Sequence, residues 1–125
     1  MNPRFQPAGV TELQRVGLLA TLPGQTLAQL AERMRREPIP AGHAVVDEGD
    51  EGERFYVVLS GMFAVTQASL GPRRVLRPGD YFGEVALAME IPRTASVRAL
   101  TPSTVASCDR ETFDEFVRPL FADDA

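Results

Sequence analysis

Hydrophobic residues recur at helical spacing only near the two ends of the chain. In the first stretch, Thr11 and Gln14 have the form of a capping box, and Leu13 and Val16 follow on one face. The sequence therefore predicts a first helix that begins at residue 11. The Pro23–Gly24 pair is expected to end it, because proline and glycine both disfavour helix interiors.

A second apolar stripe follows this break. Its members fall on one face of a helix that is predicted to run to about Arg36: Leu27, Leu30, Ala31 and Met34. Arg33, Arg35 and Arg36 would close this helix, where cations offset the negative end of the helix dipole. Pro38 then prevents it from continuing.

Between residues 39 and 108 the pattern changes to short β-prone runs separated by glycine, proline and aspartate. The predicted strands are Val45–Val46, Phe55–Leu59, Met62–Thr66, Arg74–Leu76, Ala95–Leu100 and Thr104–Ser107. Ser60–Gly61 and Leu70–Gly71–Pro72 are predicted hairpin turns. Short strands at this spacing favour an antiparallel β-roll or jelly roll.

After the strands, Asp109 can cap a C-terminal helix over residues 109–120. Its predicted inward face consists of Phe113, Phe116, Val117 and Leu120. Pro119 is expected to end or kink this helix. The chain is thus predicted to be mainly β with flanking helices, with a tail over residues 1–10 and one domain over residues 11–125. Within that domain, helices would occupy residues 11–36 and the roll residues 39–108.

Composition fits a single globular domain and narrows its partners. The 125 residues are 44% hydrophobic and 24% charged, with a formal net charge of −4. This negative balance argues against nucleic acid or anionic lipid as a partner. The N-terminus carries no apolar signal region, and no run reaches the length of a bilayer span, so the expected location is cytoplasmic.

The inventory of reactive side chains argues against an enzyme. A metal enzyme on a jelly roll needs several histidines, and this chain has only His43, which lies in a predicted turn. Cys108 is expected to be a small buried residue at a strand end, without a base beside it. The glycines match neither the phosphate loop of nucleotide hydrolases nor the dinucleotide fingerprint. No catalytic residue and no metal ligand is predicted.

One stretch, residues 81–97, combines the features of a phosphate-binding loop. Gly83 permits a tight turn, and the residues after it can begin a helical turn whose free N–H groups bind an anion. Arg93 supplies a planar cation that suits two phosphate oxygens. Glu84 would repel a phosphate but can accept a hydrogen bond from a neighbouring hydroxyl. A ribose cyclic phosphate carries both an anion and such a hydroxyl.

The motifs F-G-E-V-A-L and P-R-T-A-S-V within this stretch resemble the phosphate-binding cassette of the cyclic-nucleotide-binding domain family. The resemblance extends upstream to residues 49–52, 55–61 and 77–80, and it covers about residues 13 to 118. It implies a regulatory module that binds cAMP, with cGMP as a further ligand. It also implies an effector domain or protein that is not part of this chain.

The resemblance assigns roles to single residues. Glu84 and the Gly83 backbone would bind the ribose 2′-hydroxyl, and Arg93 would bind an exocyclic phosphate oxygen. The backbone amides at residues 85–86 and 94–95 would complete the phosphate site, and apolar side chains would flank the base and sugar. The full expected set is Val65, Leu76, Phe82, Gly83, Glu84, Val85, Ala86, Arg93, Thr94 and Ala95.

The sequence leaves open whether the domain binds a ligand at all and what would cover the ligand base. A domain of the same fold that serves only in docking or oligomerisation is the alternative function. A separate structural alternative is that Glu84 and Arg93 form a salt bridge with each other. Sensors of the resembled family usually continue into a further helix that covers the base, whereas this chain stops at residue 125.

Thr94 offers a hydroxyl that suits a syn guanine, although cAMP is expected to be slightly favoured. Arg73, Arg74 and Arg77 would raise the local potential for an anionic ligand.

Overall fold

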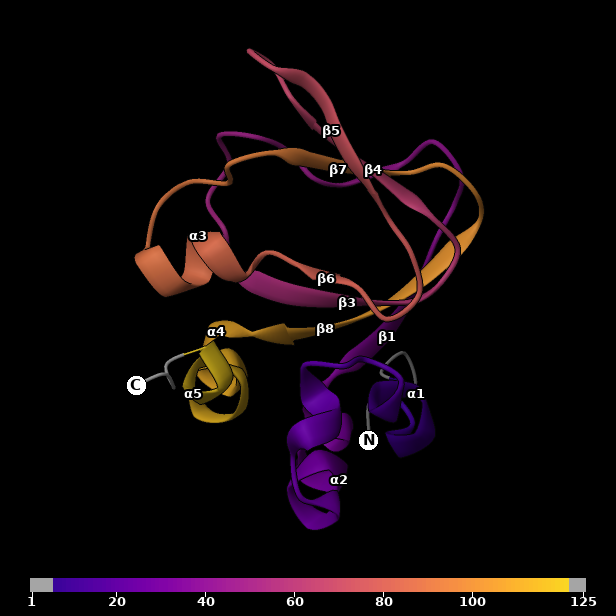
Figure 1. Cartoon of the computed structure of the whole chain (residues 1–125), viewed down its shortest axis with the longest axis vertical. Coiled ribbons are helices and arrows are strands. Elements are labelled where there is room, and N and C mark those ends of the chain that lie inside the picture. The colour runs from indigo at the N-terminus through magenta and orange to yellow at the C-terminus, as the bar shows by residue number, and fades with distance from the viewer. Residues whose placement is uncertain (1–5, 122–125) are drawn as a thin grey trace.

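A computed structural model describes residues 6–121, in which two four-stranded sheets face each other (Figure 1). The first sheet has the order β1 (Arg35–Ile39), β8 (Ser103–Asp109), β3 (Arg54–Ser60), β6 (Tyr81–Phe82). The second has the order β2 (Ala44–Val46), β7 (Ser96–Ala99), β4 (Phe63–Gln67), β5 (Gly71–Leu76). All paired strands are antiparallel, which confirms the predicted β-roll.

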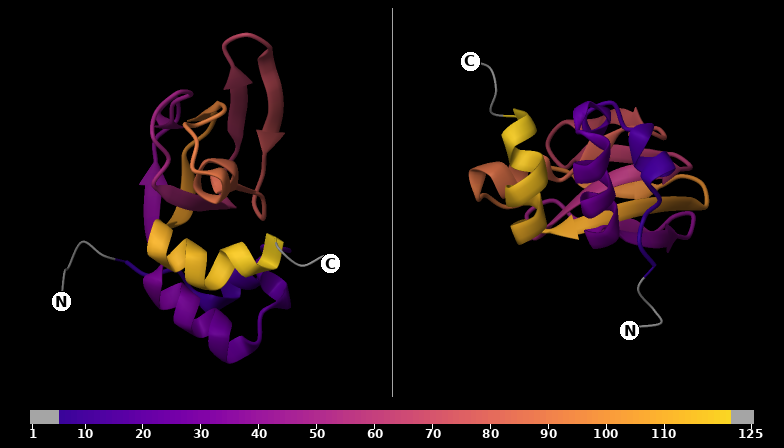
Figure 2. Two further views of the ribbon diagram at one scale, coloured as in Figure 1. Left: turned by 90° about the vertical axis from the view of Figure 1, so that its left-hand side faces the viewer. Right: turned by 90° about the horizontal axis from the view of Figure 1, so that it is seen from below.

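Helices cover the outer face of the first sheet and one end of the roll (Figures 1 and 2). The N-terminal helices are α1 (Val10–Gln14), the 3-10 turn η1 (Leu19–Thr21) and α2 (Gly24–Arg33). Helix α3 (Glu84–Met89) lies between β6 and β7 in sequence. The C-terminal helix, residues 110–121, is built from α4 (Arg110–Thr112), the π-helical segment η2 (Phe113–Val117) and α5 (Arg118–Phe121).

The N-terminal helices are shorter than the sequence pattern predicts. Helix α1 is capped by Gly9, not by Thr11, and the Glu12 carboxylate accepts a hydrogen bond from the Gly9 N–H at 3.1 Å. The chain then leaves the helix at Arg15 and forms only one further 3-10 turn before Pro23. Pro23 is the N-cap of α2, which begins at Gly24. The predicted break at Pro23–Gly24 therefore coincides with the start of the second helix.

The predicted extension of the second helix to Arg36 is wrong. Helix α2 ends at Arg33, and residues 35–39 form strand β1, which pairs with β8. Arg36 donates its backbone N–H to the Gln6 carbonyl at 2.7 Å. Pro38 is tolerated because β1 is an edge strand of its sheet. Long-range pairing with β8 therefore overrides the local helical pattern, which sequence periodicity alone cannot detect.

One of the two predicted hairpins forms. Strands β4 and β5 pair around the turn before Gly71, as predicted. The Ser60–Gly61 turn instead carries the chain from one sheet to the other, because β3 pairs with β6 and β8 while β4 pairs with β5 and β7. This prediction is wrong, since a turn motif does not reveal whether the strands on its two sides will pair with each other.

The C-terminal helix begins as predicted but does not end at Pro119. The Asp109 carboxylate accepts a hydrogen bond from the Thr112 N–H at 2.9 Å, which is the predicted cap. The helix continues through Pro119 to Phe121. The five residues from Phe113 to Val117 adopt the wider π-helical turn. A wider turn accommodates the proline ring, which would clash with a carbonyl of a regular helix.

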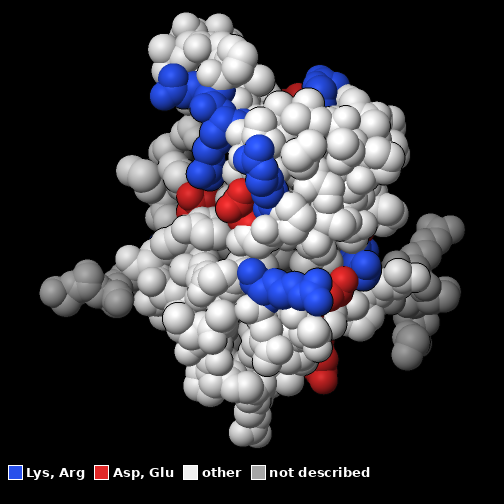
Figure 3. Space-filling model, turned by 45° about the vertical axis from the view of Figure 1, so that its right-hand side comes forward, with Lys and Arg blue, Asp and Glu red and all other residues white. Residues whose placement is uncertain are grey.

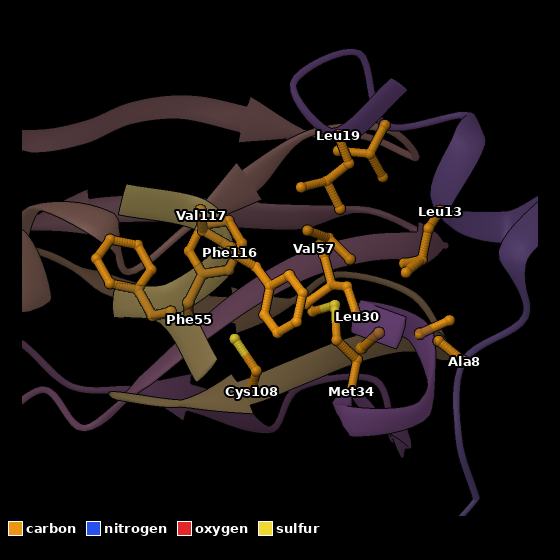
Figure 4. Close-up of a cluster of buried hydrophobic side chains, with 14 of the residues drawn as sticks. Ala8, Leu13, Leu19, Leu30, Met34, Phe55, Val57, Cys108, Phe116 and Val117 are labelled. Carbon is orange, nitrogen blue, oxygen red and sulfur yellow. The ribbon is translucent and has the colours of Figure 1, made fainter. Parts of the chain in front are cut away.

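The first sheet separates two hydrophobic cores, and β3 contributes to both. Phe55 and Val57 pack with the helices, whereas Tyr56 and Val58 pack between the sheets. Figure 4 shows the core on the helical side, where Phe116 and Val117 lie near Phe55. This alternation follows from the two-residue period of a strand. Strand β3 is buried along most of its length for this reason.

Cys108 is a fully buried free thiol in the helical core, as predicted. Burial raises the pKa of its thiol to about 12.

His43 lies in the predicted turn, where its backbone N–H donates to the Pro40 carbonyl at 3.1 Å. Within residues 6–121, none of the helices has the length and apolar character that a bilayer span requires. The face in Figure 3 carries basic side chains with acidic ones close beside them.

Candidate functional site

A cavity of about 180 Å³ opens at the end of the roll beside α3. Four sequence segments contribute to its wall: β2, the β4–β5 hairpin, the stretch from β6 into α3, and the loop that leads into β7. The lining residues are Val46, Val65, Arg74, Phe82, Gly83, Glu84, Val85, Ala86, Arg93, Thr94, Ala95 and Val97. The wall thus combines apolar side chains with two cations and one carboxylate.

Gly83 makes the turn from β6 into α3, and no other residue fits there. Its φ of 94° lies in the left-handed region. A β-carbon at this position would lie 2.8 Å from Arg93 Nη1 and 2.9 Å from the Arg54 carbonyl oxygen. The turn leaves the first residues of α3, Glu84 to Ala86, on the cavity wall. The first N–H groups of a helix have no partner within it, so they can donate to a ligand.

Arg93 is buried at the base of the cavity, with 7% of its surface exposed. Its Nη2 donates to the Arg54 carbonyl at 2.9 Å, and its Nη1 donates to the Gly83 carbonyl at 3.3 Å. Burial lowers the pKa of the guanidinium, and the nearby Tyr56 and Glu84 oppose that shift. The guanidinium nevertheless keeps its charge at neutral pH. These two bonds leave further N–H groups of its five for a ligand.

The loop before β3 fixes the backbone of Arg93. The Arg93 N–H donates to the Asp50 carbonyl at 2.7 Å, and the Gly49 N–H donates to the Arg93 carbonyl at 2.8 Å. Gly52 is buried against the same group, since a β-carbon there would lie 2.5 Å from the Ala86 β-carbon and 3.0 Å from Arg93 Cζ. The glycine-rich loop at residues 49–52 therefore positions the buried cation.

An aromatic pair, Tyr56 and Phe82, lies next to this cation, and Phe82 also lines the cavity. Tyr56 and Phe82 stack with their ring centroids 4.8 Å apart and their planes at 6°. The Arg93 guanidinium carbon lies 5.9 Å from the centre of the Tyr56 ring. Burial raises the pKa of the Tyr56 hydroxyl, while the positive charge of Arg93 acts in the opposite direction.

Glu84 does not pair with Arg93. Within residues 6–121, the Glu84 carboxylate forms neither an ion pair nor a side-chain hydrogen bond. It is half-buried and lies on the cavity wall. The alternative in which Glu84 and Arg93 serve only as a structural pair with each other therefore has no ion pair to support it. Its oxygens are available to accept a hydrogen bond from a ligand hydroxyl.

The segment after Arg93 is held by the neighbouring strand β4 of the second sheet. Gln67 of β4 donates through Nε2 to the Thr94 carbonyl at 2.8 Å, so the loop that carries Thr94 and Ala95 is tied to the roll. Arg74 lies directly across from Val65 in the β4–β5 register. Of the three arginines that are predicted to raise the local potential, Arg74 lines the cavity, whereas Arg73 and Arg77 do not.

All the predicted site residues except Leu76 line this one cavity. Leu76 is fully buried across from Phe63, within the core between the sheets. It lies on the same strand face as Arg74, two residues farther along β5, but is buried away from the cavity. The cavity is also lined by Val46 and Val97, which were not among the expected site residues and which pair with each other in the second sheet. Their strand register depends on pairing across the roll and leaves no local motif.

The family model for the cyclic nucleotide-binding domain matches residues 36–119. The chain belongs to the cyclic nucleotide-binding domain family. The match includes the glycine-rich loop at residues 49–52 and the whole stretch from Gly83 to Ala95, so it covers the cavity just described.

Similar proteins share this domain within longer chains. A cAMP-dependent protein kinase regulatory subunit from Eremothecium gossypii is 38% identical over 108 residues, which is 86% of this chain and 24% of that protein. The corresponding subunit from Emericella nidulans is 37% identical over 96% of this chain and 30% of its own length. The chain thus spans about a quarter to a third of these relatives.

Solved structures show the same fold. The regulatory domain of Toxoplasma gondii protein kinase A with cAMP matches with a TM-score of 0.83 and 29% identity, over 89% of this chain and 44% of that one. A regulatory subunit of a cAMP-independent protein kinase A from Trypanosoma cruzi, bound to guanosine, matches with a TM-score of 0.81 and 26% identity. That match covers 89% of this chain and 41% of the other.

Proposed function

We propose that this chain is a regulatory module that binds a purine 3′,5′-cyclic monophosphate in the cavity beside α3. The observation that carries this proposal is the buried cation Arg93 on a wall that also holds the Gly83 turn and the unpaired Glu84 carboxylate. A buried charge is costly unless it has a function or a partner. A cyclic phosphate supplies the partner, and its ribose supplies the hydroxyl.

The residues divide the ligand between them. Arg93 binds an exocyclic phosphate oxygen, and the backbone amides at Ala86, Thr94 and Ala95 complete the phosphate site. Glu84 accepts a hydrogen bond from the ribose 2′-hydroxyl, which lies beside the Gly83 backbone. Val65, Phe82 and Val85 provide apolar surface for the sugar and base.

The relatives make cAMP the first ligand to test and a protein kinase the first effector. Their printed names describe regulatory subunits of a cAMP-dependent protein kinase. We therefore propose a regulatory role without catalysis, in which binding of cAMP changes the interaction with a kinase catalytic subunit or another effector. The docking-only alternative predicts that no cyclic nucleotide binds.

Calorimetric titration tests the proposal. The chain should bind cAMP one to one, and nucleotide at a hundred times its Kd should stabilise the fold by about 2.7 kcal/mol. Arg93→Ala should weaken binding roughly ten- to a hundredfold, because it removes charge-assisted hydrogen bonds. Arg73→Ala is the matched control, since Arg73 is exposed on the hairpin and does not line the cavity. Unchanged melting with millimolar cAMP and cGMP, together with no heat of binding, would favour the docking-only alternative.

Guanosine separates a phosphate site from a nucleoside site. The Trypanosoma cruzi protein is bound to guanosine, which carries no phosphate. In this chain Arg93 is buried at the cavity, so we expect the phosphate to contribute much of the binding energy. We expect guanosine to bind far more weakly than cGMP. Equal affinities would contradict the assignment of Arg93 to the phosphate.

A further inference from the structure

The loop that carries Thr94 and Ala95 lies beyond the paired part of the second sheet. Strands β4 and β7 pair in register only as far as Thr66 and Ser96. Both loop residues nevertheless line the cavity, and Figure 1 shows the loop running from α3 to β7. A backbone segment outside a ladder opens more easily than one within it. The geometry of this part of the cavity wall therefore depends on bonds from other groups.

Gln67, the last residue of β4, extends the attachment beyond the ladder. Its Nε2 donates to the Thr94 carbonyl at 2.8 Å. A trans peptide unit is planar, so its carbonyl and the N–H of the next residue point in opposite directions. A Thr94 carbonyl that is held by Gln67 thus also fixes the direction of the Ala95 N–H. That N–H is one of the donors that the proposed phosphate site requires.

The preceding peptide unit is held in the same way by the loop before β3. The Gly49 N–H donates to the Arg93 carbonyl at 2.8 Å, which fixes the direction of the Thr94 N–H. The neighbouring Glu48 N–H donates to Ser96 Oγ at 2.9 Å. Two successive peptide units after Arg93 are therefore oriented through their carbonyl oxygens, which carry no part of the ligand contact.

Glu48 also supports Gln67. Its Oε1 accepts a hydrogen bond from the Ala68 N–H at 2.8 Å, and Ala68 directly follows Gln67. A bond from an N–H to a carboxylate is stronger than one between neutral groups. The backbone of Gln67 is thus fixed on one side by the ladder at Thr66 and on the other by Glu48. Its side chain reaches the Thr94 carbonyl from a firm base.

We propose that Gln67 is a positioning residue for the cyclic phosphate: through the Thr94 carbonyl it directs the Ala95 N–H at a phosphate oxygen. This inference rests on the proposed function. Gln67 is half-buried and does not line the cavity, so it acts through the loop backbone and not by contact with the ligand. A donor that is already oriented binds more tightly, because the entropy of ordering it is not lost on binding.

The first experiment uses the nucleotide-free chain. Gln67→Met keeps the length of the side chain but removes its donor. By NMR relaxation, the backbone order parameters of Thr94 and Ala95 should fall from about 0.85, typical of rigid backbone, towards about 0.6. Gln29→Met is the matched control, because Gln29 is exposed on α2 and does not line the cavity. Unchanged order parameters at these two residues in Gln67→Met would overturn the proposal.

The second experiment adds cAMP. Gln67→Met should bind it about three- to tenfold more weakly than the wild type or Gln29→Met, which corresponds to one net hydrogen bond. In the wild type, saturating cAMP should move the Ala95 amide proton resonance downfield, because the N–H then donates to a charged oxygen. At saturating cAMP this shift should be clearly smaller in Gln67→Met. An equal shift in the two proteins would show that Ala95 needs no help from Gln67 and would overturn its positioning role.

Two variants of Glu48 separate its bond from its charge. Glu48→Gln keeps an oxygen that can accept the Ala68 N–H and should bind cAMP as tightly as the wild type. Glu48→Met removes the acceptor and should weaken binding about two- to threefold. Equal losses in the two variants would overturn the supporting role of the Glu48 bond.

The two levels of the proposal can fail separately. Failure of the wild type to bind cAMP or cGMP would overturn the proposed function and the role of Gln67 in binding together. The nucleotide-free order parameters still decide whether Gln67 holds the loop. Normal binding of cAMP by both the wild type and Gln67→Met would leave the proposed function intact and overturn the role of Gln67 alone.

Discussion

The two hydrophobic cores on either side of the first sheet differ in how they end. The helical core joins the N-terminal and C-terminal helices to one face of the sheet, and its buried members are apolar, with Cys108 among them. The core between the sheets is also apolar at its centre, around Phe63, Leu76 and Val105. At the α3 end, however, it gives way to the cavity and to the buried charge of Arg93.

Because of this difference, we expect the helical core to contribute to stability alone and the core between the sheets to contribute to ligand binding as well. A closed apolar core gains free energy in proportion to the area that it removes from water. A cavity with a desolvated cation forgoes part of that gain, and a ligand can restore it on binding. We therefore expect the same kind of substitution to have different consequences on the two sides of the first sheet, and strand β3 between them provides the common frame.

A matched pair of leucines tests this separation with the largest expected effects. Leu30 and Leu76 are both fully buried, one in each core. Each leucine-to-alanine change should lower the free energy of unfolding by about 2–5 kcal/mol, as measured by denaturant titration. Only Leu76→Ala should also weaken cAMP binding by the folded protein, because Leu76 shares a core with the cavity-lining residues Phe82 and Val97. Equal effects of both variants on cAMP affinity would contradict the separation.

Gly52→Ala tests how tightly the buried cation is packed. The new methyl group would lie 2.5 Å from the Ala86 β-carbon and 3.0 Å from Arg93 Cζ, so Arg93 or α3 must shift. Overpacking of this kind costs about 1–3 kcal/mol. We expect roughly a tenfold loss of cAMP affinity in calorimetric titration, from the displaced guanidinium. Gly24→Ala is the control, since its methyl group would meet no atom within 4 Å.

Arg74 and Thr94 sharpen the ligand side of the comparison. A guanidinium complements the O6 and N7 acceptors of guanine, whereas adenine presents an amino donor at that edge. Arg74→Ala should therefore cost cGMP about 1 kcal/mol, roughly fivefold, more than it costs cAMP. Thr94→Ala should act in the same direction through one hydroxyl, worth about 0.5–1.5 kcal/mol. Parallel titrations with both nucleotides measure this, and equal losses would show that neither side chain contacts the base.

The smallest expected effect concerns the cap of the C-terminal helix. Hydrogen bonds from Thr112 lower the pKa of the Asp109 carboxyl. A lowered pKa means that this contribution to stability is present above the ordinary carboxyl pKa of about 3.9 and is lost as the pH falls through the lowered value. Asp109→Ala should cost about 0.5–1 kcal/mol at pH 7. The difference between wild type and variant should vanish in strong acid, and a constant difference would exclude the carboxylate as its source.

Much of the site was predictable because its chemistry lies within one short stretch. Gly83, Glu84 and Arg93 follow one another within eleven residues, and local turn chemistry accounts for the Gly83 turn that places Glu84 at the start of α3. The strands from Phe55 and from Met62 were predictable for a similar reason, since β-branched and aromatic residues stand between turn residues. The C-terminal helix cap at Asp109 likewise depends on its immediate neighbours.

The remainder depends on contacts between distant segments. The carbonyl of Arg54 and the close approach of Gly52 fix Arg93 from about forty residues away, and no local pattern announces them. Strand β1 exists because β8 pairs with it, although its sequence R-R-E-P-I suggests a helix end followed by a stop. The depth of Leu76 depends on the register between β4 and β5, which one residue of slip would change.

Strand β3 sends alternate side chains into two separate cores, and this has a consequence for how the family can diverge. Insertion or deletion of one residue within β3 would exchange its two faces and place Phe55 and Val57 where Tyr56 and Val58 belong. Selection should therefore keep the length of β3 constant. The tip of the β4–β5 hairpin, with Leu70 60% exposed, belongs to neither core. Gains and losses of residues over evolutionary time should accumulate there, where they can reshape the hairpin beside the cavity without disturbing the fold.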